Sequence, residues 1–81
     1  MGRDVANIVL SELGEGIDKA TVAYWHCQVG DRVEQGNDVV EVVTDKAAFN
    51  ICAETGGTIK EIYIQVGEEA AVGAALAVLT L

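Results

Sequence analysis

The stretch that decides the fold occurs twice, as TVAYWHCQVGD at residues 21–31 and as TIKEIYIQVGE at residues 58–68. A shift of 37 residues superposes the two copies, with Gly30 on Gly67, and extends beyond them, aligning Gly36 with Gly73, Val39 with Leu76 and Val42 with Leu79. The repeated glycines are expected at turns that need positive φ. Two halves of one pattern predict a pseudo-two-fold pair of sheets packed face to face.

Around this repeat the chain reads as short β-strands, expected at residues 6–11, 21–29, 39–44, 47–53, 58–66 and 76–81. In the stretch 58–66, Ile62, Ile64 and Val66 are expected to share one face. No window keeps a helical period, and Gly73 interrupts the alanine-rich stretch 69–77. The sequence therefore predicts an all-β sandwich or barrel, with a core of Trp25, Val39, Val42, Ile62, Leu76 and Leu79.

The bulk composition limits the possible functions. A chain of 81 residues is one small domain with little room for both a core and a catalytic pocket. A net charge of −8 disfavours nucleic acid as a partner. No apolar run approaches the roughly 20 residues that span a bilayer, and no targeting segment is visible. We expect a monomeric domain at residues 6–81 after a poorly ordered segment 1–5.

The residues that most often bind metals or act as nucleophiles are few. Cys27 and Cys52 lie 25 residues apart and form no metal-binding motif with the single histidine, His26. Both cysteines are expected to be reduced, half-buried apolar side chains, and His26 is expected on the surface. No metal site and no catalytic constellation is therefore predicted.

One lysine occupies a special place between the two halves. The first half ends in Val43-Thr44 and the next strand starts near Ala48, with Asp45, Lys46 and Ala47 between them. Two β-runs joined by so short a polar link predict a hairpin, and Asp suits an early turn position. Lys46, one of five basic residues, is therefore expected at the tip with its amine in water.

These residues together resemble a known family. Asp45-Lys46-Ala47, Val66-Gly67-Glu68 and Leu13-Gly14-Glu15-Gly16-Ile17, with Trp25 and Val29-Gly30-Asp31, are similar to the lipoyl domain of 2-oxo acid dehydrogenase acyltransferases. The resemblance implies a flattened β-barrel, or barrel-sandwich hybrid, of two four-stranded antiparallel sheets. It implies lipoic acid bound covalently to Lys46, with Asp45 and Ala47 as flanking recognition residues. It also implies that Leu13, Gly14, Glu15 and Gly16 contribute to recognition by the decarboxylase.

The resemblance further implies a non-catalytic carrier. A lipoate ligase or lipoyl transferase would modify it, and it would serve a thiamine-diphosphate decarboxylase, an acyltransferase core and a flavin dihydrolipoyl dehydrogenase. Such complexes occur in the bacterial cytoplasm or the mitochondrial matrix. The sequence slightly favours the pyruvate or branched-chain type and leaves the acyl group open.

The sequence departs from the family pattern in two respects. The chain has no proline, and Ser11, Asp38, Cys52 and Ala75 stand where family members often carry one. Phe49 is bulkier than the residue expected three positions after the lysine, which leaves partner specificity open. Two alternatives remain. A biotinyl carrier is disfavoured because the lysine of that family lies between methionines, whereas Asp45 and Ala47 flank Lys46 here. The other alternative is an unmodified structural barrel-sandwich module.

Overall fold

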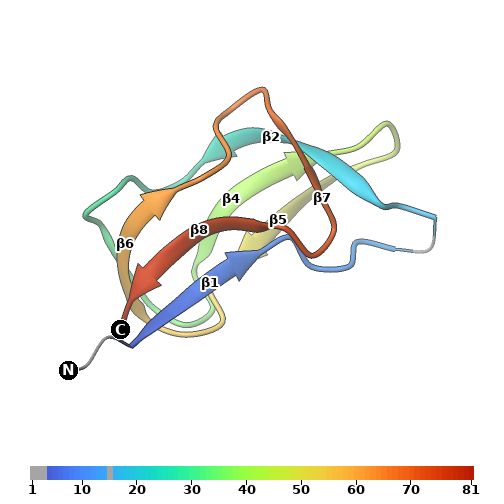
Figure 1. Ribbon diagram of the computed structural model, residues 1–81. Coiled ribbons are helices and arrows are strands. Elements are labelled where there is room, and N and C mark those ends of the chain that lie inside the picture. Colours follow the sequence, from blue (N-terminus) through green and yellow to red (C-terminus); the bar gives the residue numbers. More distant parts are fainter. Residues whose placement is uncertain (1–3, 15) are drawn as a thin grey trace.

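The computed structural model describes residues 4–14 and 16–81, and these form two antiparallel sheets (Figure 1). One sheet has the order β1-β8-β6-β3 and the other the order β5-β4-β2-β7. The strands are β1 (Val5–Val9), β2 (Lys19–Trp25), β3 (Arg32–Val33), β4 (Asp38–Val43), β5 (Ala48–Cys52), β6 (Gly57–Ile62), β7 (Glu69–Ala71) and β8 (Ala75–Thr80). The all-β prediction with two four-stranded sheets is confirmed; no strand of one sheet pairs with the other in the described residues, so the barrel is not closed.

The two sheets are copies of each other. The shift of 37 residues carries β4 onto β8, β2 onto β6 and β3 onto β7, and the same strand order results in both sheets. The amide of Gly30 donates to the carbonyl of Ile59 at 2.8 Å, while their counterparts Gly67 and Val22 form the reciprocal bond at 2.8 Å. The predicted pseudo-two-fold arrangement is therefore present down to individual hydrogen bonds.

The repeated glycines occupy the turns predicted for them. Gly30 and Gly67 have φ angles of 96° and 91°, and Gly36 and Gly73 have 91° and 93°. A side chain would be strained in this left-handed region, which explains why glycine recurs there. Each copy uses the same residue type to reverse the chain between its strands.

The core lies between the sheets and follows the repeat. Three pairs of counterparts are at most 1% exposed, namely Val22 with Ile59, Val39 with Leu76 and Val42 with Leu79. Burying each such side chain stabilises the fold by roughly 1.5–3 kcal/mol. Trp25 and Ile62 are only partly buried against this cluster, because each is the last residue of its strand. The prediction that both lie in the core is wrong to that extent.

The strand predicted at residues 58–66 is too long. β6 ends at Ile62, and the chain then turns, so that Val66 is 58% exposed. The alternation of Ile62, Ile64 and Val66 therefore does not continue on one face of the sheet. The short strands β3 and β7 were not predicted at all.

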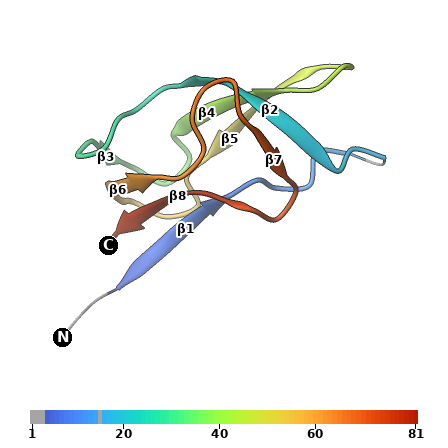
Figure 2. The same ribbon diagram turned by 45° about the horizontal axis from the view of Figure 1, so that its top comes forward.

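The two chain ends meet at one end of the molecule. Val5 pairs with Thr80, and the amide of Leu81 donates to the carbonyl of Asp4 at 3.1 Å. The hairpin between β4 and β5 lies at the opposite end, as both views show (Figures 1 and 2). Residues 1–3 of the expected poorly ordered segment lie outside the described residues. Within the described residues, no helix is long and apolar enough to cross a membrane.

Candidate functional site

The hairpin that joins β4 to β5 holds the lysine predicted as the site. β4 ends at Val43 and β5 begins at Ala48, so four residues make the turn. The amide of Thr44 donates to the carbonyl of Ala47 at 2.9 Å and closes it. Neither Asp45 nor Lys46 has a positive φ. The predicted hairpin is therefore present, with Asp45 and Lys46 as its two central residues.

Lys46 is exposed at this tip. The ion pairs of the described residues join Lys19 to Glu69 and Arg32 to Glu34, and Lys46 takes part in neither. Within residues 4–14 and 16–81, its amine is therefore not paired with a carboxylate. The hairpin that carries it lies at the end of the molecule opposite the chain ends (Figure 1). Asp45 and Ala47, the predicted flanking residues, are also exposed, on either side of it.

The loop predicted to take part in recognition lies at the same end of the molecule (Figure 2). Leu13 is half-buried and packs against the core, which anchors the loop to the sandwich. Gly14 and Gly16 are exposed with φ angles of 149° and 82°, and the amide of Ile17 donates to the carbonyl of Gly14 at 3.1 Å. Glu15, the fourth residue of the predicted set, lies outside the described residues.

A surface hollow of about 550 Å³ connects this loop with the hairpin. Its wall includes Gly16, Ile17 and Asp18 on one side and Thr44, Asp45 and Lys46 on the other. The structure thus brings part of the predicted recognition loop and the predicted attachment lysine to one surface. Lys46 is thus exposed and borders this hollow.

Phe49 contributes to a second hollow, which was not predicted as a surface feature. This hollow of about 350 Å³ lies between the loop and β5, and its lining includes Glu12, Leu13, Phe49 and Glu54. Phe49 is half-buried and packs against the core. Its bulk and its position three residues past the lysine were the only signals of it in the sequence.

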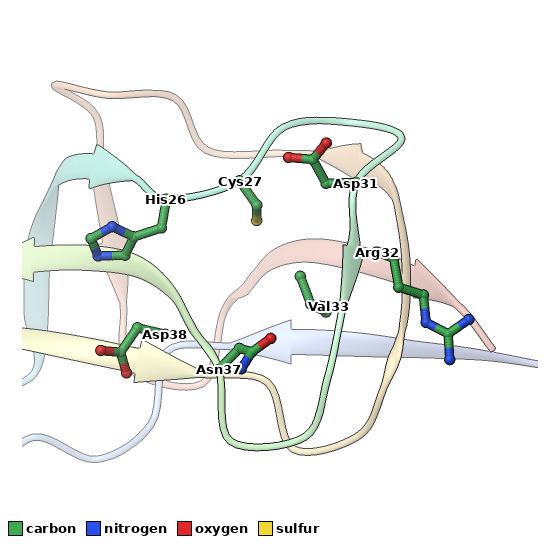
Figure 3. A pocket seen from close by; sticks show the side chains of 7 residues that line it. All are labelled: His26, Cys27, Asp31, Arg32, Val33, Asn37 and Asp38. Atoms are coloured by element: carbon green, nitrogen blue, oxygen red, sulfur yellow. The ribbon is translucent and has the colours of Figure 1, made fainter.

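A third hollow, of about 390 Å³, lies near the end of β4 that is opposite the Lys46 hairpin, and its lining includes no lysine (Figure 3). Two of its polar side chains are engaged within their own turns. Asp31 accepts a hydrogen bond from the amide of Gln28 at 2.9 Å, and Asn37 accepts one from the amide of Glu34 at 2.9 Å. No group of three or more His, Cys, Asp or Glu side chains in the described residues is placed to hold a metal ion.

The two cysteines differ more than the sequence suggested. Cys27 is buried, whereas Cys52 is exposed, so the expectation of two half-buried thiols is wrong for both. Burial, followed by the negative charge of Asp31, raises the pKa of the Cys27 thiol. The Cys52 thiol donates to Asp38 Oδ1 at 3.3 Å, and this bond is the main reason why its pKa is also raised. Both thiols are therefore held in their protonated, less nucleophilic form.

His26 lies on the surface, as predicted. Its Nε2 atom is 3.1 Å from Asn50 Oδ1, and its ring meets that of Tyr24 edge-on at 5.1 Å between centroids. No nucleophile lies in contact with it among these interactions. The histidine thus contributes to the outer surface of the β5-β4-β2-β7 sheet rather than to a reactive site.

Curated relatives of this chain are acyltransferase components of 2-oxo acid dehydrogenase complexes. The succinyltransferase component of the 2-oxoglutarate dehydrogenase complex of Staphylococcus saprophyticus is 38% identical over 89% of the chain. The branched-chain component of Caenorhabditis elegans is 40% identical over 89%, and the pyruvate dehydrogenase acetyltransferase component of Acholeplasma laidlawii is 40% identical over 78%. The chain spans only 17%, 16% and 12% of the lengths of these three relatives.

Solved structures agree with this relationship. The lipoyl domain of the 2-oxoglutarate dehydrogenase complex of Azotobacter vinelandii superposes with a TM-score of 0.70 at 33% identity, covering 91% of this chain and 96% of that one. The urea carboxylase of Kluyveromyces lactis superposes with a TM-score of 0.78 over 98% of this chain and 6% of its own, and its 23% identity shows the shared fold alone. A family model described as "biotin-requiring enzyme" matches residues 6–79. With its whole sandwich matched in sequence and in shape, this chain belongs to the biotin–lipoyl family.

Proposed function

We propose that this protein is a lipoyl carrier domain and that the Nζ atom of Lys46 is the attachment point. The observation that carries the proposal is the placement of Lys46, whose exposed amine forms no ion pair within the described residues, in the four-residue connection at the tip of the β4–β5 hairpin. The amine would attack an activated lipoyl carboxyl group, displace the activating group and lose a proton, so that an amide forms and one positive charge is removed. The net charge of the chain would then change from −8 to −9.

The residues present suit such an arm. The tip lies at one end of the molecule, its backbone is hydrogen-bonded, and the amine borders an open hollow rather than a closed pocket. When bound, a lipoyl group supplies a redox-active dithiolane that can carry an acyl group and electrons. The protein's own part is to hold the arm at a protruding point, which raises its effective concentration at other active sites.

The partners follow from the same proposal. The domain would be modified by a lipoate ligase or lipoyl transferase. It would then serve a thiamine-diphosphate decarboxylase, an acyltransferase core and a flavin dihydrolipoyl dehydrogenase. Asp45 and Ala47 would contribute to recognition as the residues that flank the lysine. Leu13, Gly14 and Gly16 would contribute to recognition by the decarboxylase. The support is that the segments that hold them, the β4–β5 hairpin and the loop between β1 and β2, lie at one end of the sandwich, with Gly16 and Asp45 bordering the same hollow as Lys46 (Figure 1).

The type of complex stays open in this proposal. Relatives of the 2-oxoglutarate, branched-chain and pyruvate types match at 38–40% identity, so identity favours none of them. The proposed location is the bacterial cytoplasm or the mitochondrial matrix. It is supported by relatives that are either bacterial or named as mitochondrial.

Mass spectrometry tests the proposal directly. The domain would be incubated with lipoate, ATP and a lipoate ligase, then measured intact and after peptide digestion. One lipoyl amide on Lys46 is expected, and none on Lys19 or Lys60, which serve as internal controls. The variant Lys46→Arg keeps the charge and should remain unmodified. An increment that instead required biotin and a biotin ligase, or none on a folded domain, would overturn the proposal.

A further inference from the structure

The connection that carries Lys46 has four residues, Thr44 to Ala47, and none of them has a positive φ. Loops of this length are usually built around a type I turn, which needs no positive φ. One backbone bond closes the connection, from the amide of Thr44 to the carbonyl of Ala47. The amides of Lys46 and Ala47 take no part in that bond, so holding them in place needs further support.

The Thr44 side chain supplies that support. Its Oγ1 atom accepts hydrogen bonds from the amide of Lys46 at 3.1 Å and from the amide of Ala47 at 3.2 Å. The same hydroxyl donates to the carbonyl of Ala47 at 3.2 Å. A hydroxyl has one donor and two acceptor positions, so all of its hydrogen-bonding capacity is used at this tip.

The internal repeat provides a built-in comparison. The residue 37 positions after Thr44 is Leu81, which has no hydroxyl. Its amide donates to the carbonyl of Asp4 at 3.1 Å, just as the Thr44 amide donates to Ala47. The backbone bond is thus common to both copies, whereas the hydroxyl is found only in the copy that presents a lysine on a turn.

We propose that Thr44 is a positioning residue for the modification of Lys46, an inference that rests on the proposed lipoyl carrier function. The hydroxyl fixes the amide of the lysine itself and that of the next residue, and so holds the direction in which the side chain leaves the tip. A modifying enzyme then meets an ordered hairpin. Without the hydroxyl, the enzyme must order the tip on binding, and the cost of that ordering is subtracted from the binding free energy.

The effect should appear in the binding of the domain to its ligase rather than in the chemistry. The amine of Lys46 is unchanged by a substitution at residue 44, so kcat for lipoylation should stay within about twofold of wild type. The KM for the domain should rise about five- to tenfold, the range that corresponds to one net hydrogen bond. This split distinguishes a positioning role from a loss of the reactive group.

The test compares Thr44→Val, which keeps the shape without the hydroxyl, with Thr44→Ser, which keeps the hydroxyl. Initial rates of lipoylation by a lipoate ligase would be measured by mass spectrometry over a range of domain concentrations. Amide hydrogen exchange at Lys46 and Ala47 would report the order of the tip independently of the ligase. Thr58→Val is the matched control, because Thr58 lies in β6 and its hydroxyl forms no hydrogen bond in the described residues.

The expected result is a raised KM and faster amide exchange in Thr44→Val, with both restored in Thr44→Ser and unchanged in Thr58→Val. Wild-type values for KM and exchange in Thr44→Val would overturn the positioning role, and so would a failure of serine to restore them. If Thr44→Val proved unfolded, Thr44→Ser against Thr44→Ala would give the same comparison. A wild-type domain that is not lipoylated at all would instead refute the carrier function.

Discussion

The indole N–H of Trp25 donates to the carbonyl oxygen of Ile64 at 2.9 Å, and this bond connects the two sheets. Trp25 ends β2 in one sheet, and Ile64 follows β6 in the other. The residues at the same places in the repeat cannot form a reciprocal bond, because Ile62 stands at the place of Trp25 and has no side-chain donor. The bond is therefore one of the few features that make the two halves unequal.

Replacing Trp25 by phenylalanine tests that bond. Phenylalanine keeps most of the apolar contact but leaves the Ile64 carbonyl without its donor, so the free energy of unfolding should fall by about 1–2 kcal/mol. Trp25→Ala should cost about 3 kcal/mol, the low end of the range for a buried aromatic, because the ring is only partly buried. Urea titration followed by circular dichroism measures both. A neutral Trp25→Phe would show that the bond contributes nothing.

Replacing Lys46 by alanine should separate stability from function. Lys46 is exposed at the tip and forms no ion pair in the part of the chain that the structure describes, so the free energy of unfolding should change by less than about 0.5 kcal/mol. Lipoylation should be abolished. Thermal unfolding and intact mass check the two halves of the prediction. A large loss of stability would mean that the lysine has a structural role.

The repeat predicts equal costs at equivalent glycines. Gly30→Ala and Gly67→Ala each place a methyl group on a residue with φ above 90°, and neither methyl group would meet another atom within 4 Å. Each should lower the free energy of unfolding by about 1–2 kcal/mol through backbone strain alone. The two values, from urea titration, should agree within about 0.5 kcal/mol. Clearly unequal values would mean that the two turns differ in energy despite their matching bonds.

The contact between Asp38 and Cys52 makes a prediction about thiol reactivity. Asparagine at position 38 removes the carboxylate that holds the thiol proton, so the pKa of Cys52 should fall. The pH profile of its alkylation by iodoacetamide should therefore shift to lower pH than in wild type. Cys27 is buried and should not react in the folded domain, which makes it an internal control. An unshifted profile in Asp38→Asn would contradict the role of the carboxylate.

The buried thiol of Cys27 should make stability fall at alkaline pH. Its pKa is raised in the folded state by burial and by Asp31, so the unfolded chain releases the proton first as the pH rises. The stabilisation is fully present below the ordinary thiol pKa and is lost as the pH rises through the raised value. Urea titrations across this range should show a shallower fall for Cys27→Ala than for wild type. Identical slopes would refute the linkage.

Most of the fold could be predicted from the repeat, because the shift of 37 residues aligns the buried positions with one another. β3 and β7 could not, since strands of two and three residues leave no readable alternation. The equivalence of β1 and β5 was also hidden. Those strands are related by a shift other than 37 residues. Two matching bonds show their equivalence, from the amide of Gly73 to the carbonyl of Leu10 after β1 and from the amide of Gly36 to the carbonyl of Ala53 after β5.

The site was predictable in location but not in detail. The junction between the two halves indicated a hairpin tip at Lys46, and the structure has one. The role of the Thr44 hydroxyl could not be read from the sequence, because threonine is equally ordinary at the end of a strand. The exposure of Cys52 was also missed, although β5 carried a signal for it: the polar Asn50 lies two residues earlier, and alternate residues of a strand share a face.

The bond between Leu81 and Asp4 has the same place in the repeat as the bond between Thr44 and Ala47. β8 and β1 therefore pair in the same way as the two strands of the β4–β5 hairpin, but without a turn that joins them. Joining them through a short turn and opening the chain at Asp45 and Lys46 should give a circular permutant with the same sandwich. If the joining turn carried a threonine and a lysine in the pattern of residues 44–47, the domain would present an amine at each end.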